Sequence, residues 1–486
     1  MTDAPGAAAA TLRSGRPATV GLGDAIMLGL SSSGPAQTLA VSLASLVAAC
    51  HYGGVVALLV CFVPMLGIAI GYQRLNRWDP NAGATYTWVA RVFHPLLGFL
   101  SGWMILLYYT LGTSSLTIPA GTYTLELVAP GLVDRPVAVA IAGGVWNVAV
   151  TLLALRGLKV AARFEWLVVL FQYAVLLTLA GAGLWLLAHG ATAAPFSWSW
   201  FSWQGIGGLR GLMSGILVAC FMYSGWDAAI YVNEESVDGA NSPGRAAIAS
   251  VVILALFYVV AVLGLQAAIA PEELQRHAGN ALAVIGRALL PGPWGPVLSL
   301  AVLTGTLATL QAAVISAARV SFAMARDRVM PALFRRLDPV TGSPRAATIV
   351  MSVLNLGLLA LALATDSISA ALGNVVSSLG LISILFYGLT GAAAVWQQRA
   401  LLTRSAADLL LGGLLPGGGA LFMLWVAVES VLSGATSPTI LAYGAGSVAL
   451  GAIVALIVRR YSSSPFFYRG SQLACDASST VREPTS

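Results

Sequence analysis

The chain has 486 residues, of which 58% are hydrophobic and only 9% are charged, and its mean hydropathy is +0.84. Soluble globular domains carry about 25% charged residues, so this composition excludes a soluble protein and indicates a polytopic membrane protein. The net charge of +6 comes from short basic clusters between apolar runs, which is typical of membrane loops and not of a nucleic-acid-binding surface.

Apolar runs of about 20 residues predict twelve transmembrane helices. They cover 24–49, 53–73, 96–121, 136–156, 164–188, 208–233, 246–270, 294–319, 346–364, 369–396, 407–432 and 438–459. The stretch 73–93 is too amphipathic for a crossing and is expected to lie along the cytoplasmic face. The first 20 residues lack an apolar signal-peptide core, and the four cysteines lack metal-ligand spacing. We therefore expect no cleaved signal, disulfide, metal site or cofactor.

The basic residues predict the orientation of the chain. An even number of spans places both termini on one side of the membrane. With cytoplasmic termini, 21 of the 25 Lys and Arg residues fall in cytoplasmic segments, and the four that remain outside are Arg135, Arg210, Arg276 and Arg287. The positive-inside rule therefore predicts a multi-pass plasma-membrane protein with both termini in the cytoplasm.

Two of the predicted spans are interrupted. The first reads IMLGLSSSGPAQTLAVSL, and its Gly34–Pro35 pair removes a backbone donor and permits unusual dihedral angles. The sixth reads CFMYSGWDAAIYVNEE, with Ser224 and Gly225 inside the apolar run. A lone Gly-Pro pair is more often a simple kink. Two interruptions about 190 residues apart, at matching positions in two halves of the chain, instead favour a transporter site at the midplane of an inverted repeat.

Asp227 is the one acid that falls clearly within a predicted span, whereas Glu126, Glu165, Asp366 and Glu429 are expected in loops or at span ends. An ionisable side chain at bilayer depth costs roughly 2.5–3.5 kcal/mol on insertion scales, so Asp227 needs compensation. A ligand ammonium, a proton or freed backbone amides can supply it. In the alternative reading, Asp227 is only a structural cap for the break.

Four stretches resemble the amino acid–polyamine–organocation transporter superfamily, commonly called amino acid permeases. They are GLGDAIMLGLSSSGPA, DPNAGATYTWVARVFHPLLGFLSGW, FMYSGWDAAIYVNEE and SAARVSFAMARDRVMP. Their order, together with the twelve predicted spans, extends the resemblance over about residues 20 to 460.

The resemblance implies an all-α fold of two inverted five-helix repeats with discontinuous helices one and six, plus two peripheral helices. It divides the chain into a cytoplasmic tail (1–22), a first repeat (23–188), a second repeat (205–396) and two peripheral helices (405–460). The polar, Ser-rich segment 461–486 is expected to be a disordered cytoplasmic tail.

The resemblance also implies a substrate site at the two breaks. In relatives, backbone amides at the helix-one break hold the substrate carboxylate, and carbonyls at the helix-six break hold its amine, as helix dipoles favour. The matching positions are Ser32, Ser33 and Gly34 for the carboxylate and Phe221, Met222 and Ser224 for the amine. Phe221 also matches a gating aromatic, Asp227 matches an acid linked to coupling or gating, and Tyr108, Tyr109 and Thr113 match one wall of the site. These aromatic residues are otherwise explained by packing alone.

The chain departs from the family pattern at three points. It has SSSGPA in place of a GSG-type run, and Gln172 stands where some proton-coupled relatives have a Lys, so that coupling device is missing. The run Val314, Ile315 and Ser316 supplies one hydroxyl where a second sodium site needs two, which disfavours sodium coupling.

The sequence therefore predicts a secondary transporter that moves amino acids or related small amines by alternating access, as a proton symporter or an exchanger. Its expected partners are a small-molecule substrate, protons and the lipid bilayer. A polyamine or other organocation carrier of the same fold is the alternative. An intramembrane enzyme is disfavoured because the four histidines, His51, His94, His189 and His277, lie near span ends.

Overall fold

The computed structural model describes residues 18–202, 204–276, 281–290, 292, 294–363, 368–432, 438–462 and 464–467. Over these residues the chain is helical, and the β-structure is limited to an isolated bridge between Val20 and Ser236. The first of the two predicted tails, up to residue 17, and the second from residue 468 onward lie outside the described residues.

The first half of the chain contains the α-helices α1 (Leu22–Ser33), α2 (Pro35–Cys50), α3 (Gly54–Trp78), α4 (Thr85–Val92), α5 (Pro95–Val128), α6 (Pro136–Leu155) and α7 (Leu158–Ala188). The second half contains α8 (Gly208–Tyr223), α9 (Ala228–Tyr231), α10 (Ser242–Leu265), α11 (Pro271–Arg276), α12 (Ala281–Leu289), α13 (Trp294–Arg326), α14 (Arg345–Leu363), α15 (Ile368–Gln398), α16 (Ala406–Asp408), α17 (Leu415–Leu432) and α18 (Pro438–Tyr461). Short 3₁₀ turns lie at His51–Gly53, Pro130–Leu132, Trp198–Phe201, Gln204–Ile206, Asn233–Glu235 and Ala332–Arg335, and a π-helical turn at Leu409–Leu414 precedes α17.

The described helices have the length and surface of a membrane protein. Ten helical stretches, from Leu22–Trp78 to Leu441–Tyr461, are long and apolar enough to span a bilayer, and Arg345–Leu361 is a shorter apolar helix. Large apolar side chains such as Leu167 and Leu421 are about 70% exposed, while the polar Gln311 is fully buried. Apolar side chains outside and polar ones inside suit a lipid solvent, so the prediction of a polytopic membrane protein is confirmed.

Both predicted helix interruptions are present. Gly34, with φ +52°, separates α1 from α2, and Gly225, with φ +103°, lies between α8 and α9. The two interruptions touch, because a Cβ on Gly225 would lie only 2.8 Å from the Ser32 carbonyl oxygen. The two interruptions that the sequence places at matching positions in the two halves of the chain are therefore in contact in the structure.

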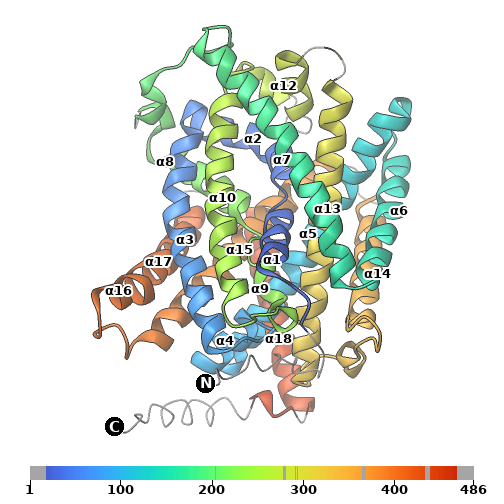
Figure 1. The fold of residues 1–486 in the computed structure, drawn as a ribbon, viewed down its shortest axis with the longest axis vertical. Coiled ribbons are helices and arrows are strands. Elements are labelled where there is room, and N and C mark those ends of the chain that lie inside the picture. Colours follow the sequence, from blue (N-terminus) through green and yellow to red (C-terminus); the bar gives the residue numbers. More distant parts are fainter. Residues whose placement is uncertain are drawn as a thin grey trace, which may run out of the picture.

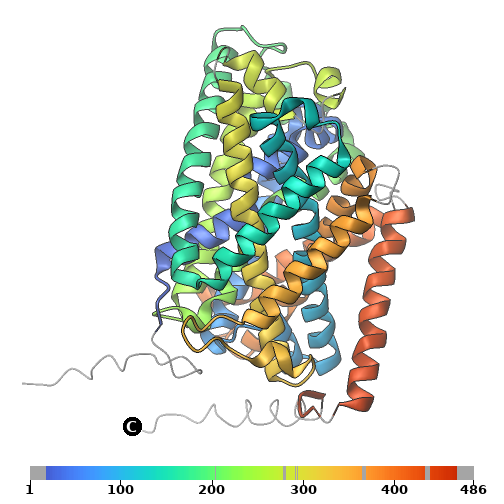
Figure 2. The ribbon, with the colours of Figure 1, turned by 90° about the vertical axis from the view of Figure 1, so that its right-hand side faces the viewer.

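Helix α1 occupies the middle of the bundle, packed against α7, α9, α10 and α13 (Figure 1). Helix α17 packs on α3 and α15, and α18 packs on α5 and α15. Figure 2 shows α18, in red, at the edge of the bundle. The α1 interruption is therefore enclosed by protein, whereas much of the α18 surface is exposed at the edge of the bundle.

The described chain starts and stops at the same end of the bundle, which we call the terminal end. Val20 bridges Ser236 there, and the Ser464 hydroxyl donates to the Asp327 carbonyl oxygen at 2.5 Å. The Phe466 ring stacks on Tyr86 with centroids 4.9 Å apart. The segment expected to be disordered from residue 461 onward therefore begins in contact with the bundle, because Phe466 covers an aromatic surface.

Two boundaries at the terminal end differ from the sequence prediction. The stretch 73–93 does not lie flat on the surface: α3 continues to Trp78, and α4 packs inside with Trp88 fully buried. The Trp88 indole donates to the Asp79 carbonyl oxygen at 2.8 Å, which satisfies its one polar group. Helix α13 extends to Arg326, beyond the predicted end at residue 319. Its added turn carries a guanidinium that pairs with Glu234 at 2.9 Å.

Candidate functional site

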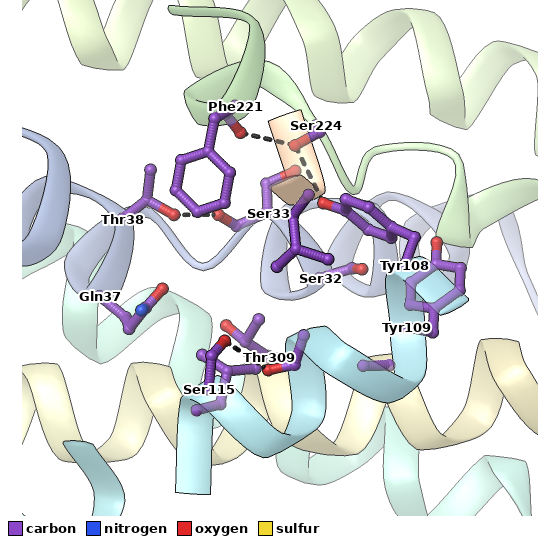
Figure 3. Close-up of a pocket in the computed structure, with 14 residues that line it drawn as sticks. Ser32, Ser33, Gln37, Thr38, Tyr108, Tyr109, Ser115, Phe221, Ser224 and Thr309 are labelled. Carbon is purple, nitrogen blue, oxygen red and sulfur yellow. Dashed lines mark hydrogen bonds between the residues drawn. The ribbon is translucent and has the colours of Figure 1, made fainter. Parts of the chain in front are cut away.

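A pocket lies where the two interrupted helices meet. Its walls come from α1, α2, α5, α8, α13, α15 and the residue after α8 (Figure 3). The lining residues are Ser32, Ser33, Gln37, Thr38, Tyr108, Tyr109, Gly112, Ser115, Leu116, Phe221, Ser224, Thr309, Ala313 and Leu379. The cavity volume is about 50 Å³. Because ligand pockets usually enclose roughly 300–1,000 Å³, the site is contracted in this structure.

The α1 side of the interruption leaves few free backbone groups. The Gly34 N–H donates to the Ser31 carbonyl at 3.0 Å, and the Thr309 hydroxyl donates to the same oxygen at 2.8 Å. The Thr38 hydroxyl donates to the Ser33 carbonyl at 2.7 Å. The Gly34 amide expected to hold a carboxylate is therefore engaged in a turn here.

Helix α2 supplies the alternative anion site. Pro35 begins this helix, and the Ala36 N–H lies 3.4 Å from the Gln172 side-chain oxygen, a long hydrogen bond. The first amides of a helix lack intrahelical acceptors and carry partial positive charge, so they attract an anion. The Gln37 side chain lines the pocket from this same turn.

The α8 side presents a helix C-terminus. Helix α8 ends at Tyr223, and the Ser224 N–H and hydroxyl both donate to the Phe221 carbonyl, at 3.0 and 2.6 Å. The Tyr108 hydroxyl donates to the Ser224 oxygen at 2.9 Å, as Figure 3 shows. The last carbonyls of a helix carry partial negative charge, which favours a cationic group beside them.

The structure brings most of the predicted site residues together. Ser32, Ser33, Tyr108, Tyr109, Phe221 and Ser224 all line the pocket. Gly34, Met222, Gln172, Asp227 and Thr113 are not among the lining residues. Met222 is fully buried in the core because a helix turns each successive residue by about 100°, away from the face that Phe221 presents.

Four polar lining residues went unpredicted from the sequence: Gln37, Thr38, Ser115 and Thr309. Gln37 and Thr38 are two and three residues after Pro35, and their position beside the predicted interruption could have indicated a role in the site. Ser115 and Thr309 had none, because single hydroxyl residues are common in membrane helices.

Asp227 lies outside the pocket lining, in a cage of aromatic side chains. It is fully buried, and its two carboxylate oxygens accept hydrogen bonds from the Tyr231 and Tyr387 hydroxyls, each at 2.8 Å. The Gly225 N–H donates to the Tyr387 oxygen at 3.1 Å, and the Trp226 ring stacks on Tyr387 with centroids 5.2 Å apart. Two phenol hydroxyls thus compensate the acid, and Tyr387 links it to the backbone of the α8 interruption.

Glu165 corrects the sequence prediction for the acids. It was expected at a span end, but α7 begins at Leu158, two turns earlier, and Glu165 is 0% exposed. Neither carboxylate oxygen has a hydrogen-bond partner among the described residues. The basic residues Lys159 and Arg163 just before Glu165 made this part of α7 look like the end of a span.

Ion pairs and amides close the terminal end beneath the two interruptions. Arg319 donates to Glu235 at 2.7 Å, and Arg326 donates to Glu234 at 2.9 Å. The Glu234 carboxylate also accepts from the Ala82 N–H at 2.9 Å, which ties η5 (Asn233–Glu235) to the turn before α4. These contacts join η5 to α13 and to the turn before α4 at the terminal end.

Comparisons with known proteins identify the family of the chain. Residues 20–432 match the family model described as amino acid permease. The chain is 24% identical over 323 residues to the methylthioribose transporter of Bacillus subtilis, covering 62% of this chain and 67% of that protein. It is 26% identical over 377 residues to the low-affinity putrescine importer PlaP of Escherichia coli, covering 76% and 79%.

A human relative, large neutral amino acids transporter small subunit 2, is 24% identical over 353 residues, covering 69% of this chain and 62% of that protein. The family match covers most of the chain and includes both helix interruptions. The chain therefore belongs to the amino acid permease family and is a membrane transporter of amino acids or related amines.

Proposed function

We propose that this permease moves a neutral amino acid across the plasma membrane by alternating access. The observation that carries the proposal is the pocket, which is bounded by both helix interruptions and lined by residues without charged side chains. The ammonium and carboxylate of an amino acid can then be met by helix ends of opposite polarity. The α2 N-terminus suits the carboxylate, and the α8 C-terminus suits the amine.

The same pocket argues against a polyamine as the main substrate. A polyamine brings two or more positive charges and no carboxylate, and the lining residues supply no acid to pair with them. The nearest described intramembrane acid at the α8 interruption, Asp227, already accepts two tyrosine hydroxyls. The apolar Leu116, Phe221 and Leu379 instead suit an uncharged side chain.

The topology we propose has twelve spans arranged as two inverted five-helix repeats and two peripheral helices. It treats Leu22–Trp78 as two passes, since α2 and α3 are separated by the turn His51–Gly53, and counts the shorter Arg345–Leu361 as a pass. The contact between the interruptions at Gly34 and Gly225 supports the repeat. With this topology the terminal end is cytoplasmic, as the basic loops require.

Alternating access would require the contacts at the terminal end to break. We infer that the pairs Arg319–Glu235 and Arg326–Glu234 are the contacts that would hold that end shut, with the substrate path opening first to the opposite face. Separation of these pairs would then release substrate into the cytoplasm. Phe221, which lines the contracted pocket, is the proposed gate on the substrate side.

The test is uptake by purified protein in liposomes. The labelled panel contains leucine, alanine, glutamate, lysine, putrescine and methylthioribose, each with no gradient, a pH gradient and a sodium gradient. We expect saturable uptake of a neutral amino acid, stronger with a pH gradient or with the same amino acid inside, and unchanged by sodium. Uptake of putrescine or methylthioribose alone would overturn the substrate class, and strict sodium dependence would overturn the coupling.

A further inference from the structure

Glu165 is a buried acid that the proposed substrate site does not use. It lies on α7, where that helix packs against α1 and α13. An apolar interface lies one to two turns before it on α7: Leu158 and Ala161 belong to one buried cluster with Leu28 on α1 and Ala312 on α13. Glu165 is one turn beyond Ala161 on the same helix, so it extends this apolar interface toward the α1 interruption.

The Ser31 hydroxyl on α1 lies beside the Glu165 carboxyl. That hydroxyl donates to the Leu28 carbonyl at 3.2 Å. Both Glu165 oxygens are left without a donor among the described residues. An ionised carboxylate in such a place would carry the full cost of burying an unpaired charge, whereas a neutral acid does not.

Charged neighbours do not offset that cost. Among side chains that the structure describes, the titratable groups on elements packed against α7 are Asp24 on α1, Cys50 on α2, Arg163 and Tyr173 on α7, Arg245 and Tyr258 on α10, Arg287 on α12, and Arg319 and Arg326 on α13. Asp24 accepts from the Trp166 indole at 3.0 Å, and the arginines are exposed or paired with Glu234 and Glu235. No cation in this set pairs with Glu165.

Helix α13 brings a second polar group without a partner to the same level. A Cβ on Gly305 would lie 2.6 Å from the Gln172 oxygen, which fixes how α13 and α7 are aligned. The two helices run antiparallel, since Ala161 near the start of α7 clusters with Ile315 near the end of α13. Two turns from this Gln172–Gly305 contact, Glu165 lies on α7 at about the level of Gln311 on α13, whose side chain is turned by about 120° from the Gly305 face. Both polar atoms of Gln311 are buried and unpartnered among the described residues.

We propose that Glu165 is the proton-carrying residue of this transporter. It is protonated while α1 is packed on α7 and α13, and it releases its proton to water when that interface opens. The proton passes from the carboxylic acid to a water molecule, leaving the carboxylate and a hydronium ion. Because Ser31 is in the last turn of α1 and the next two residues line the pocket, opening the interface also moves the substrate site. Protonation and substrate release are coupled through one helix end.

A proton fits this site better than a metal ion. A hard cation needs several oxygen ligands, and the nearby oxygens of Ser31 are already engaged. Its carbonyl accepts from the Gly34 N–H and from the Thr309 hydroxyl, and its hydroxyl is turned to Leu28. The coupling role rests on the proposed transport function, whereas the proton site itself does not.

The proton site is tested by infrared spectroscopy of the purified protein, which needs no substrate. Wild-type protein at neutral pH should show the C=O stretch of a buried protonated carboxylic acid, and Glu165→Gln should lose that band. The matched control Asp24→Asn removes an acid on the facing helix that has its own donors, and it should keep the band. A spectrum unchanged by Glu165→Gln, in a variant that elutes and melts like wild type, overturns the assignment.

The coupling role is tested with the same labelled panel in liposomes. Glu165→Gln should abolish accumulation driven by a pH gradient, while counterflow exchange at equal pH persists and no longer responds to pH. Asp24→Asn should behave like wild type in both assays. Driven accumulation by Glu165→Gln at the wild-type level, or sodium drive in place of proton drive, overturns the role. If wild type moves no member of the panel, the proposed function fails, and the infrared result still decides the proton site.

Discussion

Two acids are buried on either side of the central helix α1, and only one of them has donors. Asp227 precedes α9 and accepts two tyrosine hydroxyls at 2.8 Å, while Glu165 on α7 accepts none among the described residues. Helix α1 packs against both α7 and α9. The comparison teaches that depth alone does not decide what a buried acid does. The donors around it decide whether it can keep a negative charge.

The largest effect is expected from breaking the contact that joins the two interruptions on the Asp227 side. Gly225→Ala places a Cβ 2.8 Å from the Ser32 carbonyl oxygen, at a φ of +103° that side chains rarely adopt. The left-handed conformation alone costs about 1–2 kcal/mol, and the clash is with backbone, which cannot rotate away. We expect uptake below about a tenth of wild type and a lower melting temperature.

The matched control for this change is Gly181→Ala on α7. A Cβ on Gly181 would meet nothing within 4 Å, and the residue lies inside a helix. Uptake and melting temperature should stay at or slightly above the wild-type values. Wild-type transport by Gly225→Ala would show that the two interruptions need not touch.

A smaller loss is expected when Asp227 is kept and one of its hydrogen-bond donors is removed. Tyr387→Phe removes one hydrogen bond to Asp227 and leaves the buried Gly225 N–H without its acceptor. An unsatisfied buried group costs about 1–3 kcal/mol, which unfolding in detergent can measure. Tyr231→Phe removes a donor but strands no amide, so it should cost less. Equal losses of unfolding free energy in Tyr387→Phe and Tyr231→Phe would argue against the link through Gly225. The control Tyr443→Phe, at an exposed tyrosine, should leave the unfolding free energy unchanged.

The comparison is sharpened by replacing the Asp227 carboxyl group with an amide. Asp227 does not line the pocket, so Asp227→Asn should change the substrate Kd by less than about twofold while lowering driven uptake by about fivefold, an effect near 1 kcal/mol. The asparagine keeps one acceptor oxygen for a tyrosine but turns an N–H toward the other hydroxyl. Binding by scintillation proximity and uptake in liposomes give the two values. Wild-type driven uptake would reduce Asp227 to a structural cap.

The smallest effect concerns an acid outside the membrane spans. Backbone N–H groups, first that of Thr341 and then that of Val340, hold the pKa of Asp338 at about 2. Because this folded-state pKa is depressed, the turn is stabilised above the unfolded value near 4 and loses that contribution as pH falls toward 2. Asp338→Asn should therefore leave the pH profile of transport between pH 5 and 8 unchanged. A shifted profile in this range would mean that acids outside the membrane spans contribute to it.

The sequence predicted the location of the site because each of the two helix interruptions follows from the backbone chemistry of a particular residue. Pro35 cannot donate a backbone hydrogen bond and Gly225 accepts a positive φ, so both interruptions could be located from residue types. The family resemblance implied Ser32, Ser33, Phe221 and Ser224 at those positions, and all four line the pocket. Met222 failed to line it because a neighbour in sequence points to another face of the same helix.

What the sequence determined by itself was the membrane class, the places of the interruptions and the depth of Asp227, since these depend on hydropathy and backbone chemistry along one segment. What only the tertiary structure decided was which groups meet across segments. The hydroxyls of Tyr231 and Tyr387 converge on Asp227, and no donor converges on Glu165 among the described residues. Glu165 looked like the end of a span because its helix starts in a polar stretch, and the packing of α1 and α13 over it turned that position into the interior.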